Sequence, residues 1–76
     1  MIGSTETAQK IGVEIHRLYS WEREGVLKPK HVQHGVRKFR YYSEEDIKRG
    51  IFIRMLMDDE GFTLQGAIKK LEEEER

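Results

Sequence analysis

The amino-acid sequence predicts a mainly α fold with one small β-hairpin. Four stretches carry apolar residues at helical spacing, a tight Gly12-Val13 turn joins the first two, and residues 28–42 read as a pair of strands. Two short helices joined by a glycine turn form a helix-turn-helix, and a two-stranded ribbon beside them forms a wing. We therefore expect a single winged helix-turn-helix domain over residues 1–76, with about four helices and a two-stranded wing.

The helix-turn-helix is expected over residues 5–25. Ser4 and Thr5 are suited to cap its first helix, because hydroxyl oxygens accept hydrogen bonds from the free N–H groups of a first turn. Gly25 can take the left-handed backbone conformation that ends the second helix. The apolar stripe of that second helix consists of Ile15, Leu18 and Trp21. The polar residues on the rest of it are His16, Arg17, Ser20 and Arg23.

The wing is expected over residues 28–42. Val32 and Val36 flank the sequence Gln33-His34-Gly35, which predicts a turn because glycine accepts a positive φ angle. The segment that follows, up to Tyr42, interleaves aromatic and basic residues, as β-strand material does. A two-stranded basic ribbon of this kind can lie against a sugar-phosphate backbone.

Two further helices are expected at residues 44–60 and 64–72. Ser43 is a capping residue for the first of them, and the acidic residues that follow it suit the positive end of the helix dipole. Thr63 would cap the second. The apolar rows of helix 44–60, which predict a central buried helix, are Ile47, Ile51 and Met55, then Phe52 and Leu56. The acidic run from Glu72 to Glu75 is expected to be solvated and frayed.

Composition excludes several classes of function. The 76 residues include no cysteine, so the chain has no disulfide, no thiolate nucleophile and no cysteine-ligated zinc. Three histidines without a placed carboxylate do not predict a metal site, and no serine has a positioned base. The uncharged apolar run Ile51-Phe52-Ile53 is far too short to span a membrane. We expect a soluble, cytoplasmic protein that is not an enzyme and needs no cofactor.

The formal net charge of zero conceals an asymmetry between the two halves. Residues 1–42 contain eight Lys or Arg and four Glu, a net charge of +4, whereas residues 43–76 contain six basic and ten acidic residues, a net charge of −4. A basic half with interleaved aromatic residues is typical of a surface that binds phosphates, and it predicts double-stranded DNA as the partner. The candidate DNA-binding residues are His16, Arg17, Tyr19, Ser20, Arg23, Lys30, Arg37, Lys38, Arg40 and Tyr41.

These candidates have different expected roles. Arg17, Tyr19 and Ser20 are expected near base edges in the major groove, because arginine can pair with two acceptors of guanine and a hydroxyl can donate or accept. Arg40, in the second strand, is expected to contact a phosphate. Trp21 is expected in the core rather than on a base.

Four segments of the chain have a specific order and spacing: Ala8 to Val13, Leu18 to Pro29, Arg40 to Ile47, and Glu60 to Leu64. In this order they resemble the DNA-binding domain of the MerR family of bacterial transcription regulators, over nearly the whole chain. The resemblance implies operator binding by two copies, which pair through a long coiled-coil helix after this domain. Since no such helix follows Leu71, we expect a monomer in free solution that occupies half-sites weakly.

The second helix departs from that family. Glu14-Ile15 stands where relatives usually have Ser or Thr followed by Pro, so a strong N-cap is missing, and Tyr19-Ser20-Trp21 stands where they usually have Arg-Tyr-Tyr. The operator sequence therefore cannot be carried over from the resemblance. The effector, and the choice between activation and repression, stay open as well.

Two other functions stay open at this stage. A basic groove that accepts phosphates also accepts an acidic protein partner that mimics DNA, so the chain could be a protein-docking module. An excisionase-like architectural DNA-binding factor would carry the same basic surface. A steep salt dependence of duplex binding would favour DNA over the protein partner.

Overall fold

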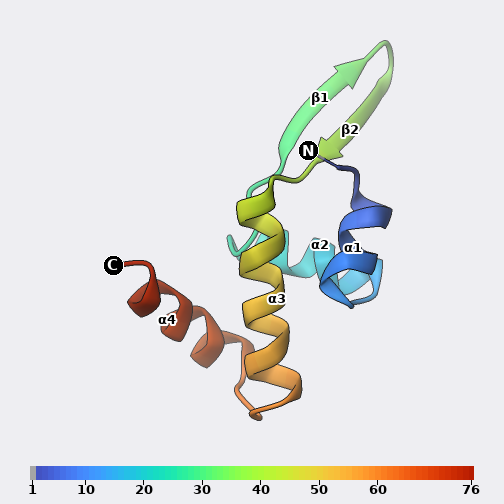
Figure 1. Ribbon diagram of the computed structural model, residues 1–76. Coiled ribbons are helices and arrows are strands. Elements are labelled where there is room, and N and C mark those ends of the chain that lie inside the picture. Colours follow the sequence, from blue (N-terminus) through green and yellow to red (C-terminus); the bar gives the residue numbers. More distant parts are fainter. Residues whose placement is uncertain (1) are drawn as a thin grey trace.

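Residues 2–76 are described by the structure, a computed structural model, and they form four helices and one two-stranded antiparallel sheet (Figure 1). The helices are α1 (Ser4–Ile11), α2 (Ile15–Arg23), α3 (Glu44–Asp58) and α4 (Leu64–Glu74), and the strands are β1 (Lys30–His34) and β2 (Arg37–Tyr41). This order confirms the predicted mainly α, winged helix-turn-helix fold. α3 packs against α1 and α4, α1 packs against α2, and the hairpin projects away from the helices.

α1 begins earlier than the sequence predicts. Its N-cap is Gly3, and Ser4 and Thr5 lie inside the helix without making a capping hydrogen bond, so the predicted cap is wrong. The cause is long-range: Ile2 pairs with Tyr42 in an antiparallel bridge, so the chain turns into the helix directly after it.

α2 ends as the sequence predicts. Gly25 has a φ of 82°, in the left-handed region. Its N–H donates to the Glu22 carbonyl at 3.1 Å, and the Val26 N–H donates to the Trp21 carbonyl at 3.0 Å. These two bonds occupy carbonyls that the end of a helix leaves free. At the other end Glu14 makes no side-chain capping bond, as the missing hydroxyl predicts. None of the helices in residues 2–76 is long and apolar enough to cross a membrane.

The wing turn lies further along the chain than predicted. His34 pairs with Arg37, so it is the last residue of β1, and the loop between the strands is Gly35-Val36. Gly35 has a φ of 63° and Val36 is not in the positive-φ region, the combination of a two-residue turn with glycine first. Such a turn matches the twist of the two strands, which favours this loop over the predicted Gln33-His34-Gly35. It leaves Val36 at the tip, 99% exposed.

α3 is the central helix, but its buried face differs from the prediction. Ile53 is fully buried, whereas Met55 is 42% exposed, so the placement of Met55 in a buried row is wrong. Residues two apart on an α-helix point nearly opposite ways, and Ile53 takes the side that faces the core. α1 approaches α3 closely at Gly50, where a Cβ would collide with the Ile11 side chain. α3 ends at Asp58 rather than at residue 60.

The start of α3 also anchors the loop before the wing. Ser43 and Asp46 form a reciprocal capping box, in which each side chain accepts a hydrogen bond from the other's backbone N–H. Asp46 is buried, and its Oδ1 accepts a further hydrogen bond of 2.9 Å from the Lys28 N–H. A buried carboxylate is stable only with such partners, and here they connect α3 to the chain that enters β1.

α4 is capped as predicted, because Thr63 Oγ1 accepts a 3.0 Å hydrogen bond from the Gly66 N–H. Its C-terminal end is more ordered than predicted: the helix continues to Glu74, and Glu75 Oε2 lies 2.7 Å from Arg49 Nε on α3. The core that the helices and the base of the wing enclose consists of Ala8, Ile11, Leu18, Trp21, Val26, Leu27, Tyr42, Ile53, Leu56, Ala67 and Leu71.

Candidate nucleic-acid interface

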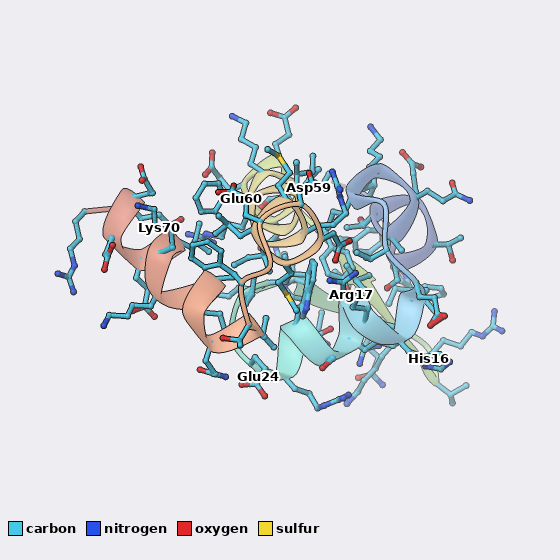
Figure 2. The ribbon with its side chains drawn as sticks, turned by 90° about the horizontal axis from the view of Figure 1, so that it is seen from below. His16, Arg17, Glu24, Asp59, Glu60 and Lys70 are labelled. Atoms are coloured by element: carbon cyan, nitrogen blue, oxygen red, sulfur yellow. The ribbon has the colours of Figure 1, made fainter. Side chains whose placement is uncertain are left out.

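α2 has one buried face and one face open to solvent. Leu18 and Trp21 are buried against the helical body. His16 and Arg23 are exposed, and Tyr19 and Ser20 are half-buried. Figure 2 shows His16 at the outer edge of α2, directed away from α3. Four of the five candidate residues on this helix therefore have access to solvent on the side away from the core.

The wing carries the other candidates. Lys30, Arg37 and Lys38 are exposed, and none of them forms an ion pair with any residue from 2 to 76. Arg40 and Tyr41 are half-buried near the base of the wing. The hairpin thus has three cations without a carboxylate partner in the described residues, Arg37 and Lys38 near its tip and Lys30 at its base, which is the arrangement expected of a surface for anions.

A carboxylate connects the base of the wing to α2. Arg40 Nε lies 2.9 Å from Glu22 Oε2 and 3.2 Å from Glu22 Oε1. The guanidinium of Arg40 also lies over the Tyr19 ring, 4.7 Å from its centroid. His31 Nε2 on β1 lies 3.3 Å from Glu22 Oε1, and this contact is an ion pair when the imidazole is protonated. Side chains from β1 and β2 therefore converge on Glu22 of α2, whose side chain is only 16% exposed.

Tyr42 also belongs to this cluster around Glu22. Its hydroxyl donates a 3.4 Å hydrogen bond to Glu22 Oε2, and the residue is fully buried. Burial raises the pKa of the Tyr42 phenol, a hydrogen bond with Ser4 opposes that rise, and the nearby Glu22 charge adds to it. The phenol therefore stays protonated at neutral pH and serves as a donor, which helps to hold the Glu22 carboxylate in place.

Arg17 is placed differently from the expectation. Its two terminal nitrogens donate to Asp58, with Nη2 at 2.8 Å from Oδ1 and Nη1 at 3.2 Å from Oδ2, and Nη2 also lies 3.8 Å from Met57 Sδ. The guanidinium lies 5.0 Å from the centroid of the Trp21 ring. Figure 2 shows Arg17 between α2 and α3. The expectation that Arg17 lies on the free polar face of α2 is therefore corrected. Arg17 is one helical turn from Trp21, so its side chain lies on the same side of α2 as Trp21, facing the helical body.

The Arg17 contact affects Asp58 in turn. The hydrogen bond from Arg17 holds the pKa of the Asp58 carboxyl below its ordinary value of 3.8. Asp58 is therefore ionised at neutral pH, and the pair closes the far end of α3 onto α2.

Three members of the Glu22 cluster lie outside the set of DNA-binding candidates predicted from the sequence: Glu22, His31 and Tyr42. One signal was available for Glu22. It is an acidic residue one helical turn after Tyr19, in a half of the chain where basic residues outnumber acidic ones. A carboxylate in such surroundings is a candidate for binding a specific arginine, although its partner on the wing cannot be read from spacing.

Comparison with known families agrees with this architecture. A family model described as MerR HTH family regulatory protein matches residues 3–74. The chain belongs to this family. A search among curated proteins and a search among solved structures each found no match.

Membership of the MerR family identifies the part that each helix and strand forms. α1 and α2 form the helix-turn-helix of a regulator of transcription, and β1 and β2 form its wing. Regulators of this family bind DNA and are not enzymes. The surface formed by the free face of α2 and by the wing is therefore the candidate DNA interface of this MerR-family domain.

Proposed function

We propose that this MerR-family domain recognises specific sequences in double-stranded DNA, with α2 in the major groove and the β1–β2 wing on the sugar-phosphate backbone. The observation that carries the proposal is the bond between Arg40 and Glu22, which joins the wing to α2. Because this contact holds the two elements together, their free polar and basic side chains form one connected surface for a duplex.

Base recognition is proposed for α2. His16, Ser20 and Arg23 have donors or acceptors with access to solvent, which suits contacts with base edges. Arg17 and Tyr19 belong to the same proposed set, but both side chains already have partners. A contact between Arg17 and a base competes with its ion pair to Asp58.

Backbone contacts are proposed for the wing. The exposed cations Lys30, Arg37 and Lys38 suit phosphate oxygens, as do the half-buried Arg40 and Tyr41 near the base of the wing. Contacts of this kind set the position of the domain on the duplex and contribute to affinity for any sequence.

The cellular role proposed for the domain is regulation of transcription in the bacterial cytoplasm, on DNA of the nucleoid. Two copies would occupy a palindromic operator, one on each half-site. The competing roles are a docking module for an acidic protein that mimics DNA, and an excisionase-like architectural factor. The first would bind a folded acidic partner in preference to a duplex, and the second would bend DNA.

Selection from random duplexes, followed by titration at several salt concentrations, tests the proposal. We expect one enriched sequence, and affinity that falls with a log–log slope of about −3 to −4 if four wing residues each neutralise one phosphate. The slope is measured on the selected duplex and on a scrambled control. An affinity that is equal at low and high salt, with no enriched sequence, would support the docking alternative instead.

A further inference from the structure

Arg40 differs from the other cations of the wing in how its side chain is held. Lys30, Arg37 and Lys38 are exposed and have no carboxylate partner within residues 2–76. The guanidinium of Arg40 is held on one edge by Glu22 and over one face by the ring of Tyr19. It is the wing cation whose orientation is fixed before any ligand arrives.

The sequence of α2 explains why both partners are available. Tyr19 and Glu22 are three residues apart, so they lie next to each other on one face of the helix. Arg40 reaches this face from β2. An arginine can stack on an aromatic face and still use all of its N–H groups in the plane of the guanidinium, so the two contacts do not compete.

The Arg40 nitrogen that contacts Glu22 determines which donors of Arg40 remain available to a ligand. Both Glu22 oxygens contact Nε of Arg40, and within residues 2–76 the two terminal nitrogens donate no hydrogen bond. These two nitrogens carry four of the five N–H donors of an arginine. Together they form one of the edges through which an arginine binds phosphate oxygens in a bidentate way.

We propose that Tyr19 and Glu22 are positioning residues that hold the Arg40 guanidinium as a preformed phosphate clamp. The inference rests on the proposed function, and it changes the role of Tyr19: its ring acts through Arg40 instead of reading a base. A long arginine side chain otherwise loses rotamer freedom when it binds, and here the protein has already restricted that freedom.

Several partners offset the negative charge of Glu22. Its carboxylate is neutralised by Arg40, also faces His31, accepts a hydrogen bond from Tyr42, and is largely buried. The phosphate would meet the outer edge of the guanidinium, on the opposite side from the carboxylate. Glu22 therefore fixes the direction of the donors while the buried side of the pair bears the negative charge.

A double-mutant cycle on DNA affinity tests the clamp. With Arg40 present, Tyr19→Ala is expected to lower affinity roughly 3- to 10-fold, because the cation–π contact is lost. In the Arg40→Ala background the same change is expected to alter affinity by less than about twofold. Tyr19→Phe is the matched control, since it keeps the ring and removes only the hydroxyl. Tyr19→Leu keeps apolar bulk without a π face, and it replaces Tyr19→Ala if the alanine variant does not fold.

Two further measurements separate positioning from direct reading. The sequence selected from random duplexes is expected to be the same for the parent and for Tyr19→Ala. In the free protein, the Arg40 side-chain NMR signals are expected to show a ring-current shift that Tyr19→Phe keeps and Tyr19→Ala loses. The Arg40 Nε–H is expected to exchange more slowly with solvent in the parent than in Glu22→Gln.

The outcomes that overturn the clamp are specific. An equal loss from Tyr19→Ala with and without Arg40, or a changed selected sequence, would show that Tyr19 contacts DNA directly. A parent protein that binds no duplex would overturn the proposed function, and the clamp with it. Duplex binding by the parent together with an additive cycle would overturn the clamp alone.

Discussion

Arg17 and Arg40 lie on opposite sides of α2 and are held in similar ways. Each guanidinium stacks over an aromatic ring of that helix, Arg17 over Trp21 at 5.0 Å and Arg40 over Tyr19 at 4.7 Å. Each also binds a carboxylate. One arginine lies against the helical body and the other at the base of the wing, so the same pair of contacts occurs in two different surroundings.

The difference between them is in the nitrogens that are used. Arg17 gives both terminal nitrogens to Asp58, whereas Arg40 gives only Nε to Glu22. The first arrangement consumes the bidentate edge of the guanidinium and closes a contact between α2 and α3. The second leaves that edge without a hydrogen bond in residues 2–76. Two arginines with the same kinds of partner can thus serve stability in one place and binding in the other.

Arg40→Ala is the change with the largest expected effect on DNA binding. We expect affinity for the selected and the scrambled duplex to fall together, about 10-fold or more, since a hydrogen bond to a charged group contributes about 1.5–3 kcal/mol. Titration of both duplexes measures the effect, and thermal unfolding checks that the variant is folded. If Arg17→Ala lost as much affinity as Arg40→Ala, the distinction between the two arginines would be wrong.

Arg17→Ala is expected to act on stability instead. Loss of the stack on Trp21 should cost about 0.5–1 kcal/mol. For a domain of this size that corresponds to a fall in Tm of about 2–8 °C, measured by thermal unfolding. Arg17→Lys is the matched control, because it keeps the charge and loses the planar, bidentate contact. An unchanged Tm for both variants would mean that the Asp58 pair does not stabilise the fold.

The smallest expected effect is the pH dependence of the Arg17 pair. The pKa of Asp58 is lowered in the folded protein, so its contribution is complete above the ordinary value of 3.8 and is lost as pH falls through the lowered pKa. The Tm difference between the parent and Asp58→Asn should therefore be constant near neutrality and shrink in acid. A difference that stayed the same down to the acid limit would exclude the ion pair as its cause.

Local chemistry accounts for what could be predicted from the sequence. The ends of α2, α3 and α4 depend on Gly25, Ser43 and Thr63, and each of these forms or accepts its hydrogen bonds within a few residues along the chain. Signals of this range can be read from spacing. The fold class follows from them, because the helices and the hairpin then have few ways to pack.

Contacts between distant residues account for the rest. Arg17 and Asp58 are 41 positions apart and Glu22 and Arg40 are 18 apart, so no helical or strand period connects them. The sequence shows that all four residues are charged, but it does not show which of them form pairs. The prediction that Met55 is buried was wrong for a related reason. α3 has apolar residues around most of its circumference, so its sequence does not show which side the other elements leave exposed.

The bridge between Ile2 and Tyr42 has a practical consequence for handling the protein. Ile2 and Tyr42 exchange two backbone hydrogen bonds, of 3.1 and 2.7 Å, at the foot of β2. Figure 1 shows the described segment ahead of α1 at the base of the wing, and the end of α4 away from the hairpin. A purification tag or fluorophore joined ahead of Ile2 would emerge beside the proposed DNA surface and could obstruct a duplex there.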